Sequence, residues 1–287
     1  MGGLFYQSEA YHIVDYDLWR LEGCDEYFRG PQMVCNPGKY VAYVGAAQTF
    51  GTFCRFPFVS LVTERVGGAA ANFGIGGAGP RRFFGDEALM RAINSAGVVV
   101  VQVMSGRSVG NSLYENLDGT SSLRLRSKPG SNWVWAESVW DELVKTKPRE
   151  DVLRLVEETR ANWVAEMRTL LQAIKPPKIL VWFSTRRPSH NFTYENAQTL
   201  LGPFPHFVNA DMLGDIMHLT DDYVEAVSSQ GLPQPLYDRF TGERTSVTRP
   251  DYARVTMNGG YPSPQMHVAA AEALAPTLVK LLKVNKA

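Results

Sequence analysis

The 287-residue sequence has few cysteines and no long apolar run. Its three cysteines, Cys24, Cys35 and Cys54, form no CxxC pair, which argues against structural disulfides and favours a reducing compartment. The longest apolar run, Val98–Val101, is far shorter than the ~20 residues that span a bilayer. The first residues show neither the basic nor the apolar region of a signal peptide. We therefore expect a soluble, cytoplasmic protein with no membrane partner.

An excess of charge of either sign is also missing. The 29 Lys and Arg residues equal the 29 Asp and Glu residues, whereas a nucleic-acid binder usually carries a basic excess. The five histidines form no HxH or HxxxH pair, so no metal site is expected. What is present is ordinary for a globular protein, with 45% hydrophobic and 20% charged residues. We expect no nucleic-acid partner, and a homo-oligomer is compatible with this composition.

Short apolar runs alternate with helical segments along most of the chain. Strands are predicted at 40–44, 69–73, 98–104, 179–183 and 206–209, and helices at 57–67, 86–95, 132–145, 150–174 and 264–283. The β-branched run VVVVQVM at 98–104 indicates burial on both faces, as in a parallel sheet. The alternation predicts a flavodoxin-like α/β fold with three α/β/α layers and a central parallel sheet of about five strands.

The chain shows no internal repeat and no persuasive domain boundary. Residues 1–38 are expected to be a lead-in segment packed on the body. Residues 39–287 are expected to form a single α/β domain with an insertion or lid at about 115–149. Trp133, Trp135 and Trp140 lie in that insertion, where they either line a lid over a substrate or belong to the core.

The segment GIGGAG at 74–79 fits the pattern GxGxxG. A dinucleotide site needs this pattern after the first strand and an acidic residue about 20 residues further on. Here the pattern follows the second predicted strand, and the next strand ends in Met104–Arg107 without an acid. A tight glycine turn is the better interpretation, and no cofactor is expected.

Glycines and small polar residues recur after the predicted strands and before the last helix. They are Gly45-Ala46-Ala47, Asn72-Phe73-Gly74-Ile75-Gly76, Gly106-Arg107-Ser108 with Asn111 nearby, and Pro264-Gln265-Met266-His267. In order, spacing and position, over about residues 40 to 283, these segments resemble the four blocks of the SGNH/GDSL hydrolase superfamily. Two positions depart from that pattern, because Ala47 replaces the nucleophilic serine and Pro264 the aspartate. GAAQTFG, GIGGAGP and SPQMH also resemble a bacterial family of unknown function, which implies no activity.

The resemblance implies an SGNH-like fold and chemistry on acyl groups. Since Ala47 has no hydroxyl, a serine mechanism needs another nucleophile, and Ser105 or Ser108 is the candidate. His267 is expected in the first turn of the last helix, after a cap at Ser263, where the helix dipole favours a neutral imidazole that can act as a base. The alternative is a histidine that only bonds a loop carbonyl.

The candidate site is thus assembled from loops at strand ends. The predicted catalytic residues are His267, Ser105 and Gln48, and the predicted substrate-binding residues are Gly45, Thr49, Asn72, Gly76, Gly106, Arg107, Ser108, Asn111 and Ser263. Arg107 and the Arg186-Arg187 pair follow strands directly, and arginines there often hold anions. Solvated arginines or structural ion pairs are the alternative.

Three functions remain open. The first is an SGNH-like enzyme acting on an ester or acyl group of a small molecule or carbohydrate. Transfer fits it better than hydrolysis, because a base alone can activate an acceptor hydroxyl. The second is a sulfotransferase-like transfer from an anionic nucleotide donor, with Arg107 and Ser112 holding phosphates, although GAAQTFG lacks the lysine of such loops. The third is a catalytically inactive binding protein.

Overall fold

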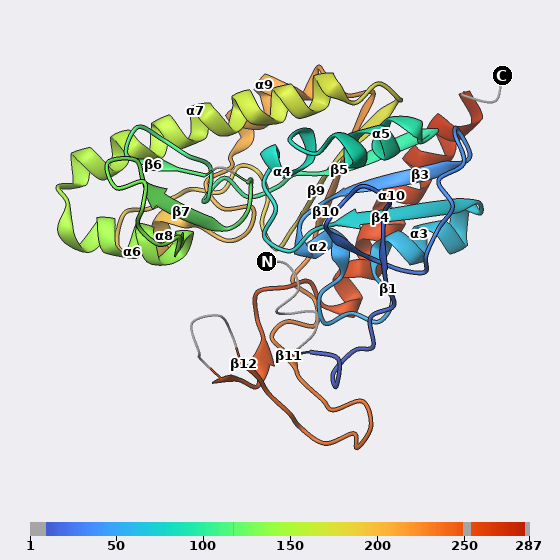
Figure 1. The fold of residues 1–287 in the computed structure, drawn as a ribbon. Helices are drawn as coiled ribbons and strands as arrows, with labels where there is room; N and C mark the ends of the chain where they lie inside the picture. Colours follow the sequence, from blue (N-terminus) through green and yellow to red (C-terminus); the bar gives the residue numbers. More distant parts are fainter. Residues whose placement is uncertain (1–9, 117, 249–253, 285–287) are drawn as a thin grey trace.

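The computed structural model describes residues 10–116, 118–248 and 254–284. Seven strands form its main sheet, in the order β1-β2-β4-β3-β5-β9-β10 (Figure 1). Their bounds are Leu18–Arg20 (β1), Tyr27–Arg29 (β2), Tyr40–Gly45 (β3), Ala69–Gly74 (β4), Val98–Gln102 (β5), Lys178–Ser184 (β9) and Asp222–Val227 (β10). β1 and β2 are antiparallel edge strands, and the five others are parallel. In chain order the parallel strands lie 2-1-3-4-5, so the predicted flavodoxin-like fold is confirmed.

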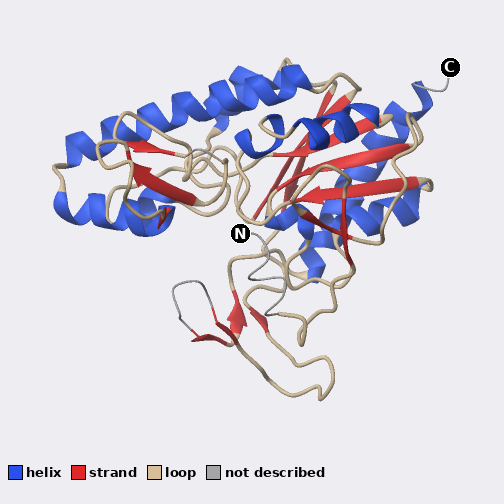
Figure 2. Cartoon of the chain, in the orientation of Figure 1, coloured by secondary structure: helices blue, strands red, loops and turns tan. Residues whose placement is uncertain are grey.

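Helices cover both faces of the sheet (Figure 2). The helices of the described ranges are Ala47–Phe50 (α2), Phe58–Val66 (α3), Arg81–Phe84 (α4), Glu87–Ser95 (α5), Ala136–Thr146 (α6), Arg149–Ala173 (α7), Ala197–Leu201 (α8), Ala210–Met217 (α9) and Pro264–Val284 (α10). Of these, α3 and α10 pack on one face of the sheet and α5, α7 and α9 on the other. Local signals explain their ends: α3 follows Pro57 and stops at Gly67, whose φ is 73°, and the Asp86 side chain caps α5.

Alternate residues of β5 enter different cores. Val99 and Val101 pack with α5, α7 and α9, whereas Val98 and Val100 pack with α3 and α10. All five residues of β5 are buried, which confirms the expectation from its β-branched run. Each large apolar side chain stabilises the fold by roughly 1.5–3 kcal/mol on burial. The sheet is therefore held in the middle layer from both sides.

The segment predicted as an insertion contains its own small sheet and a helix. Its strands are Tyr114–Glu115 (β6), Ser122–Leu125 (β7) and Val134–Trp135 (β8), and α6 follows them. Trp140 of α6 is fully buried in a third apolar cluster with α8 and the first turns of α7. Figure 1 shows this unit beside the main sheet, with α7 extending over both. The insertion thus packs around a core separate from those of the sheet.

The predicted strand 206–209 is wrong. These residues form a loop in which Phe207 has a φ of 67°, a value that strand residues do not adopt. Asn209 caps α9 instead. The fifth parallel strand is β10, which was not predicted because it lies at a sheet edge and includes exposed Glu225. Burial of Phe207 and Val208 explains the misleading apolar pattern.

Two small sheets between Ser228 and Ser263 form a projection that we call the arm. One pairs Gln234–Pro235 (β11) with Met257–Asn258 (β14), and the other pairs Val247–Thr248 (β12) with Arg254–Val255 (β13). Leu236, Val247 and Val255 of the arm pack with Phe50 and Phe53 beside α2. The arm is therefore joined to the segment that follows β3.

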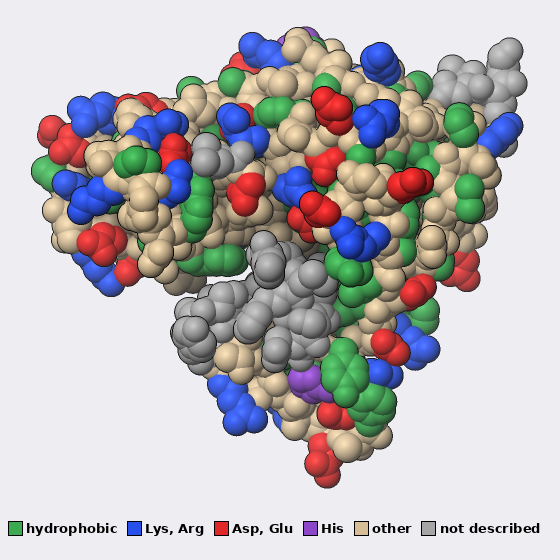
Figure 3. All heavy atoms as spheres, in the orientation of Figure 1, with side chains coloured by type: hydrophobic (Ala, Val, Ile, Leu, Met, Phe, Trp, Pro, Cys, Tyr) green, Lys and Arg blue, Asp and Glu red, His purple; other side chains and the backbone are tan. Residues whose placement is uncertain are grey.

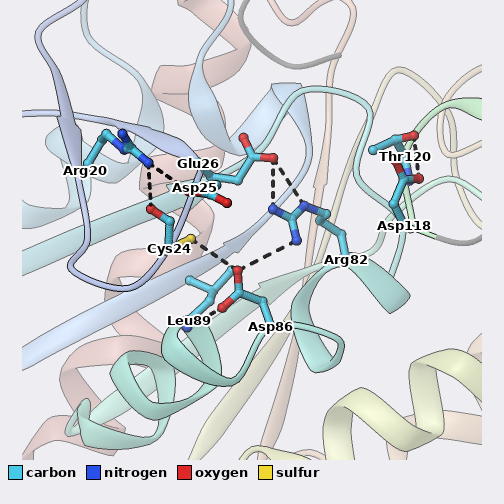
Figure 4. Close-up of polar contacts among 9 residues, drawn as sticks. All are labelled: Arg20, Cys24, Asp25, Glu26, Arg82, Asp86, Leu89, Asp118 and Thr120. Carbon is cyan, nitrogen blue, oxygen red and sulfur yellow. Dashed lines mark hydrogen bonds and ion pairs between the residues drawn. The ribbon is translucent and has the colours of Figure 1, made fainter. Parts of the chain in front are cut away.

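An ion pair from Glu26 and a hydrogen bond from Cys24 attach residues 24–26 to α4 and to Asp86, the cap of α5 (Figure 4). The Arg82 guanidinium lies 2.9 Å from Glu26 and 3.8 Å from Asp86. Burial raises the pKa of the Cys24 thiol to about 11, and the thiol donates to Asp86 over 3.2 Å. Residues 18–29 are thus tied to the rest of the structure through side chains as well as through β1 and β2.

The surface carries mixed charge. On the face in Figure 3, basic and acidic side chains are interspersed. Within the described ranges, no helix has the length and apolar character needed to cross a membrane.

Arg29 at the end of β2 connects the sheet edge to the turn that follows α2. Its buried guanidinium donates to the carbonyls of Gly51, Cys54 and Arg55 over 2.9–3.1 Å, and it stacks on Tyr16 at 4.7 Å. Burial lowers the pKa of Arg29, but the carbonyls satisfy its donors. Arg29 therefore fixes the position of the turn that follows α2.

We expect Arg29→Met to lower the free energy of unfolding by roughly 3 kcal/mol, because several buried carbonyls lose a charged donor. Urea denaturation with an unchanged m-value measures this loss. The matched control is Arg20→Met, which removes an exposed ion pair with Asp25 and should cost less than about 1 kcal/mol. Equal losses in both variants would contradict the role given to Arg29.

Candidate active site at the carboxyl edge of the sheet

A cavity of about 940 Å³ lies at the carboxyl ends of the parallel strands. Its walls come from α2, from the loops after β4, β5 and β9, from the segment 190–206, from the insertion and from the arm. β3 and β5 are the strands between which the chain reverses its strand order, and ligands of such sheets bind in the crevice there. The cavity has the size of a small-molecule site.

A serine and a histidine contact each other in this cavity. Ser105 Oγ lies 2.9 Å from His206 Nδ1, and Arg107 Nη1 lies 3.2 Å from the same nitrogen. A guanidinium can only donate, so Nδ1 has to be the unprotonated nitrogen of the ring. The Ser105 hydroxyl therefore donates a hydrogen bond to Nδ1. This is the arrangement of a nucleophile and its base.

Burial lowers the pKa of His206 well below its ordinary value of 6.5, and the positive charges of Arg107 and Arg186 lower it further. The imidazole is therefore neutral near pH 7. A neutral ring can accept a proton from Ser105, whereas an imidazolium cannot.

Arg107 joins this pair to the insertion. Its Nε lies 2.7 Å from Glu137 Oε1, although the N–H does not point at the oxygen, so the contact is a charge pair without an aligned hydrogen bond. The Arg107 carbonyl accepts a hydrogen bond of 2.8 Å from the indole of Trp140. The Arg107 side chain and backbone are thus held by different residues of α6.

Gln102 and Gln48 form a chain of hydrogen bonds near the end of β5. Gln102 Oε1 accepts from the Ala46 backbone N–H at 3.1 Å and from the Thr49 hydroxyl at 2.5 Å. The Gln102 amide nitrogen then faces Gln48 Oε1 at 3.5 Å. This orientation leaves the amide nitrogen of Gln48, a residue that lines the cavity, as a donor for a ligand.

The structure brings only some of the predicted residues into the cavity. Ser105, Gln48, Arg107 and Gly76 line it, as does Ala47. The remaining predicted residues lie outside its lining: Gly45, Thr49, Asn72, Gly106, Ser108, Asn111, Ser263 and His267. Close backbone packing rather than ligand contact explains the glycine at 45, where a Cβ would meet Thr49 and Gln102.

The polar residues outside the cavity bond within the fold. Asn72 donates to the Thr49 carbonyl at 2.9 Å and accepts from Gly74. Asn111 donates to the Thr159 hydroxyl at 3.0 Å. The Ser263 hydroxyl donates to the Gln230 carbonyl. These side chains bond to the loops around them and do not line the cavity.

His267 requires a correction. Its ring has no exposed surface and packs between Phe58 and Phe183, with centroid separations of 6.1 and 5.2 Å. Nδ1 accepts from the Phe58 backbone N–H at 3.1 Å, and the preceding Met266 reaches the cavity instead. Burial lowers the pKa of His267 to about 3. The ring is neutral, as expected, but it lies behind the cavity wall.

Arg186 and Ser112 are bonded to groups of the protein itself. The Arg186 guanidinium donates to the carbonyls of Pro203, Pro205 and Val208 over 2.6–2.9 Å. The Ser112 backbone N–H donates to the carboxylate of Glu158 at 2.9 Å. Neither residue lines the cavity. Within the described ranges, no three metal-ligating side chains come together.

Sequence reasoning missed His206 and Glu137. His206 was assigned to a strand, and it lies 101 residues from Ser105, a separation without any motif. Pro203 and Pro205 directly before it were a usable signal, because proline argues against a buried strand. Glu137 shows no sequence signal beyond its place in the first turn of α6.

The buried ring of His267 predicts a pH dependence of stability. Between pH 6.5 and about 3, the unfolded chain binds a proton that the folded protein excludes, so stability falls as the pH falls. The loss is up to about 1.4 kcal/mol per pH unit. We expect His267→Gln to flatten this decline, measured by urea denaturation from pH 7 to 4. His218→Gln, at an exposed position, is the control, and an unchanged slope for His267→Gln would contradict the prediction.

Comparisons with known proteins concern the fold and the family. The structure is similar to a lipase, Lip_vut3, from a goat rumen metagenome, with a TM-score of 0.43 and 11% identity, covering 83% of this chain and 96% of that one. It is also similar to the acetylxylan esterase Axe2 from Geobacillus stearothermophilus, with a TM-score of 0.39 and 12% identity, covering 87% and 96%. No curated protein matches the chain. The family model of a domain of unknown function, DUF6473, matches residues 4–116 and 139–282, and the chain belongs to that family.

Proposed function

We propose that this protein is an acyl-group enzyme in which Ser105 is the nucleophile and His206 its base. The substrate is an ester or acyl derivative of a small molecule or carbohydrate. The observation that carries this proposal is the 2.9 Å contact between Ser105 Oγ and an unprotonated His206 Nδ1 inside the cavity. The hydroxyl that Ala47 lacks is thereby supplied from the neighbouring strand end.

The first chemical step follows from these positions. Ser105 Oγ attacks the acyl carbon while its proton moves to His206 Nδ1. The Arg107 N–H that contacts Nδ1 has to turn away, toward Glu137, as the proton arrives. The carbonyl oxygen becomes an oxyanion, and we assign the amide nitrogen of Gln48, which lines the same cavity, as its hydrogen-bond donor. Collapse of this intermediate breaks the bond to the leaving alcohol, which takes the proton from the imidazolium and leaves the acyl group on Ser105.

The second step decides between transfer and hydrolysis. His206 takes a proton from an acceptor hydroxyl, whose oxygen attacks the acyl–Ser105 carbonyl and releases the serine. We favour transfer, because a cavity of about 940 Å³ has room for a donor and an acceptor together. Water as the acceptor gives hydrolysis by the same atoms.

We expect Ser105→Ala and His206→Gln each to lower turnover by on the order of 10²–10⁴-fold. Because the two residues act as a unit, the double variant should lose little more than either single one. Release of p-nitrophenol from p-nitrophenyl acetate, with and without a sugar acceptor, measures both routes. Ser108→Ala, in the same loop but outside the cavity lining, should retain turnover. Undiminished turnover in Ser105→Ala would reject the mechanism. If the wild-type protein binds such esters without turning them over, the alternative of a catalytically inactive binding protein is favoured.

The low pKa of His206 sets the acidic limit of activity. The neutral ring is the active form, so kcat/KM should stay constant down to a pH well below 6.5. We expect Arg107→Gln to move this limit to higher pH, since loss of its positive charge raises the pKa of His206. The pH profile of kcat/KM measures the shift. Arg187→Gln, an exposed arginine, should leave the profile unchanged, and an unmoved limit in Arg107→Gln would remove His206 as the base.

A further inference from the structure

The described residues that line the cavity carry almost no net charge. Among its described lining residues, Arg107 and Glu137 carry charge, and they pair with each other. His190 and His206 also line it, and burial lowers the pKa of both. A charged ligand would lose its hydration here without gaining an opposite charge that is free to pair with it. The cavity therefore suits an uncharged ligand.

One wall of the cavity is apolar. Phe53, Val247, Val255 and Tyr261 line it and belong to a single cluster, in which the rings of Phe53 and Tyr261 meet edge to face at 5.6 Å. This wall is formed where the arm packs beside α2. It offers an alkyl chain an apolar surface.

A different wall is rich in hydroxyl and amide groups. Asn191 and Thr193 line the cavity from the segment before α8, and Gln198 lines it from α8 itself. Thr199 of α8 also lines it, but its hydroxyl is bonded within the cap of the helix. Figure 1 shows the arm and the unit containing α8 as separate projections, so these two walls come from separate parts of the chain. Ser105 belongs to neither, because it comes from the loop after β5 of the main sheet.

We infer that the cavity takes an uncharged molecule with two unlike ends. An alkyl or acyl chain lies against the Phe53–Val255 wall, and a hydroxyl-rich group such as a sugar lies against the Asn191–Thr199 wall. The position of the reacting bond at Ser105 rests on the proposed function. The affinity for such a molecule does not, because it depends on the two walls alone.

Alkyl glucosides test this inference, because they have both ends and no acyl bond to turn over. Isothermal titration of the wild-type protein with butyl and octyl β-glucoside, below their micelle concentrations, should show affinity rising about fourfold for each methylene that is buried. Octyl sulfate, with the same chain and an anionic head, should bind more weakly than octyl glucoside. Equal affinity for butyl and octyl glucoside, or tighter binding of octyl sulfate, would overturn the inference.

A pair of tryptophan variants tests where the alkyl chain of the glucoside binds. Val255→Trp fills the apolar wall and should abolish the advantage of octyl over butyl glucoside. Thr248→Trp places the same bulk on the partner strand of the same hairpin, at a residue outside the cavity lining, and should keep that advantage. If both variants lose the higher affinity for octyl glucoside, or if neither loses it, the alkyl chain does not bind at this wall.

The two proposals fail separately. Glucoside binding with a chain-length dependence but no ester turnover would support the inference and remove the acyl chemistry. Ester turnover that depends on Ser105, together with glucoside affinity that is independent of alkyl-chain length, would support the acyl chemistry and remove the inference about the two walls.

Discussion

Buried guanidinium groups bonded to backbone carbonyls hold the loops that form the cavity. Arg29 binds the turn after α2, and Arg186 binds the loop that carries His206. Neither has an ion-pair partner in the described part of the chain. Desolvating such a charge is costly unless its donors are satisfied, and here several carbonyls at once satisfy them. Ser105 lies between these two loops, so the geometry of the site depends on two arginines that do not line it.

Indole N–H groups also hold loop backbone near the cavity by donating to carbonyls. Trp163 donates to the Met104 carbonyl at 3.1 Å, and Trp182 donates to the Arg186 carbonyl at 2.6 Å. Both rings are fully buried. The chain around the cavity has little regular secondary structure, since α2 spans only Ala47–Phe50. Long side chains from the core therefore replace helix and strand hydrogen bonds in fixing this backbone.

The sheet was predictable because burial on two faces leaves a local pattern, as in β5. The site was predictable only where a residue directly follows such a strand, as Ser105 and Arg107 do. His206 was not predictable, because its role depends on a contact between distant segments. His267 was placed correctly on its helix, but sequence position does not show which way a side chain points. Packing against Phe58 decided that direction.

The match to the family breaks off between residues 116 and 139, within the insertion. Trp135 and Glu137, which line the cavity, lie in that gap, whereas Ser105, Gln48 and His206 lie in the matched ranges. On the proposed function, the reacting groups and this part of the wall are encoded in separate stretches of sequence. A substitution in residues 117–138 would then change the surface that faces the substrate and leave the loop after β5, which carries Ser105, unaltered.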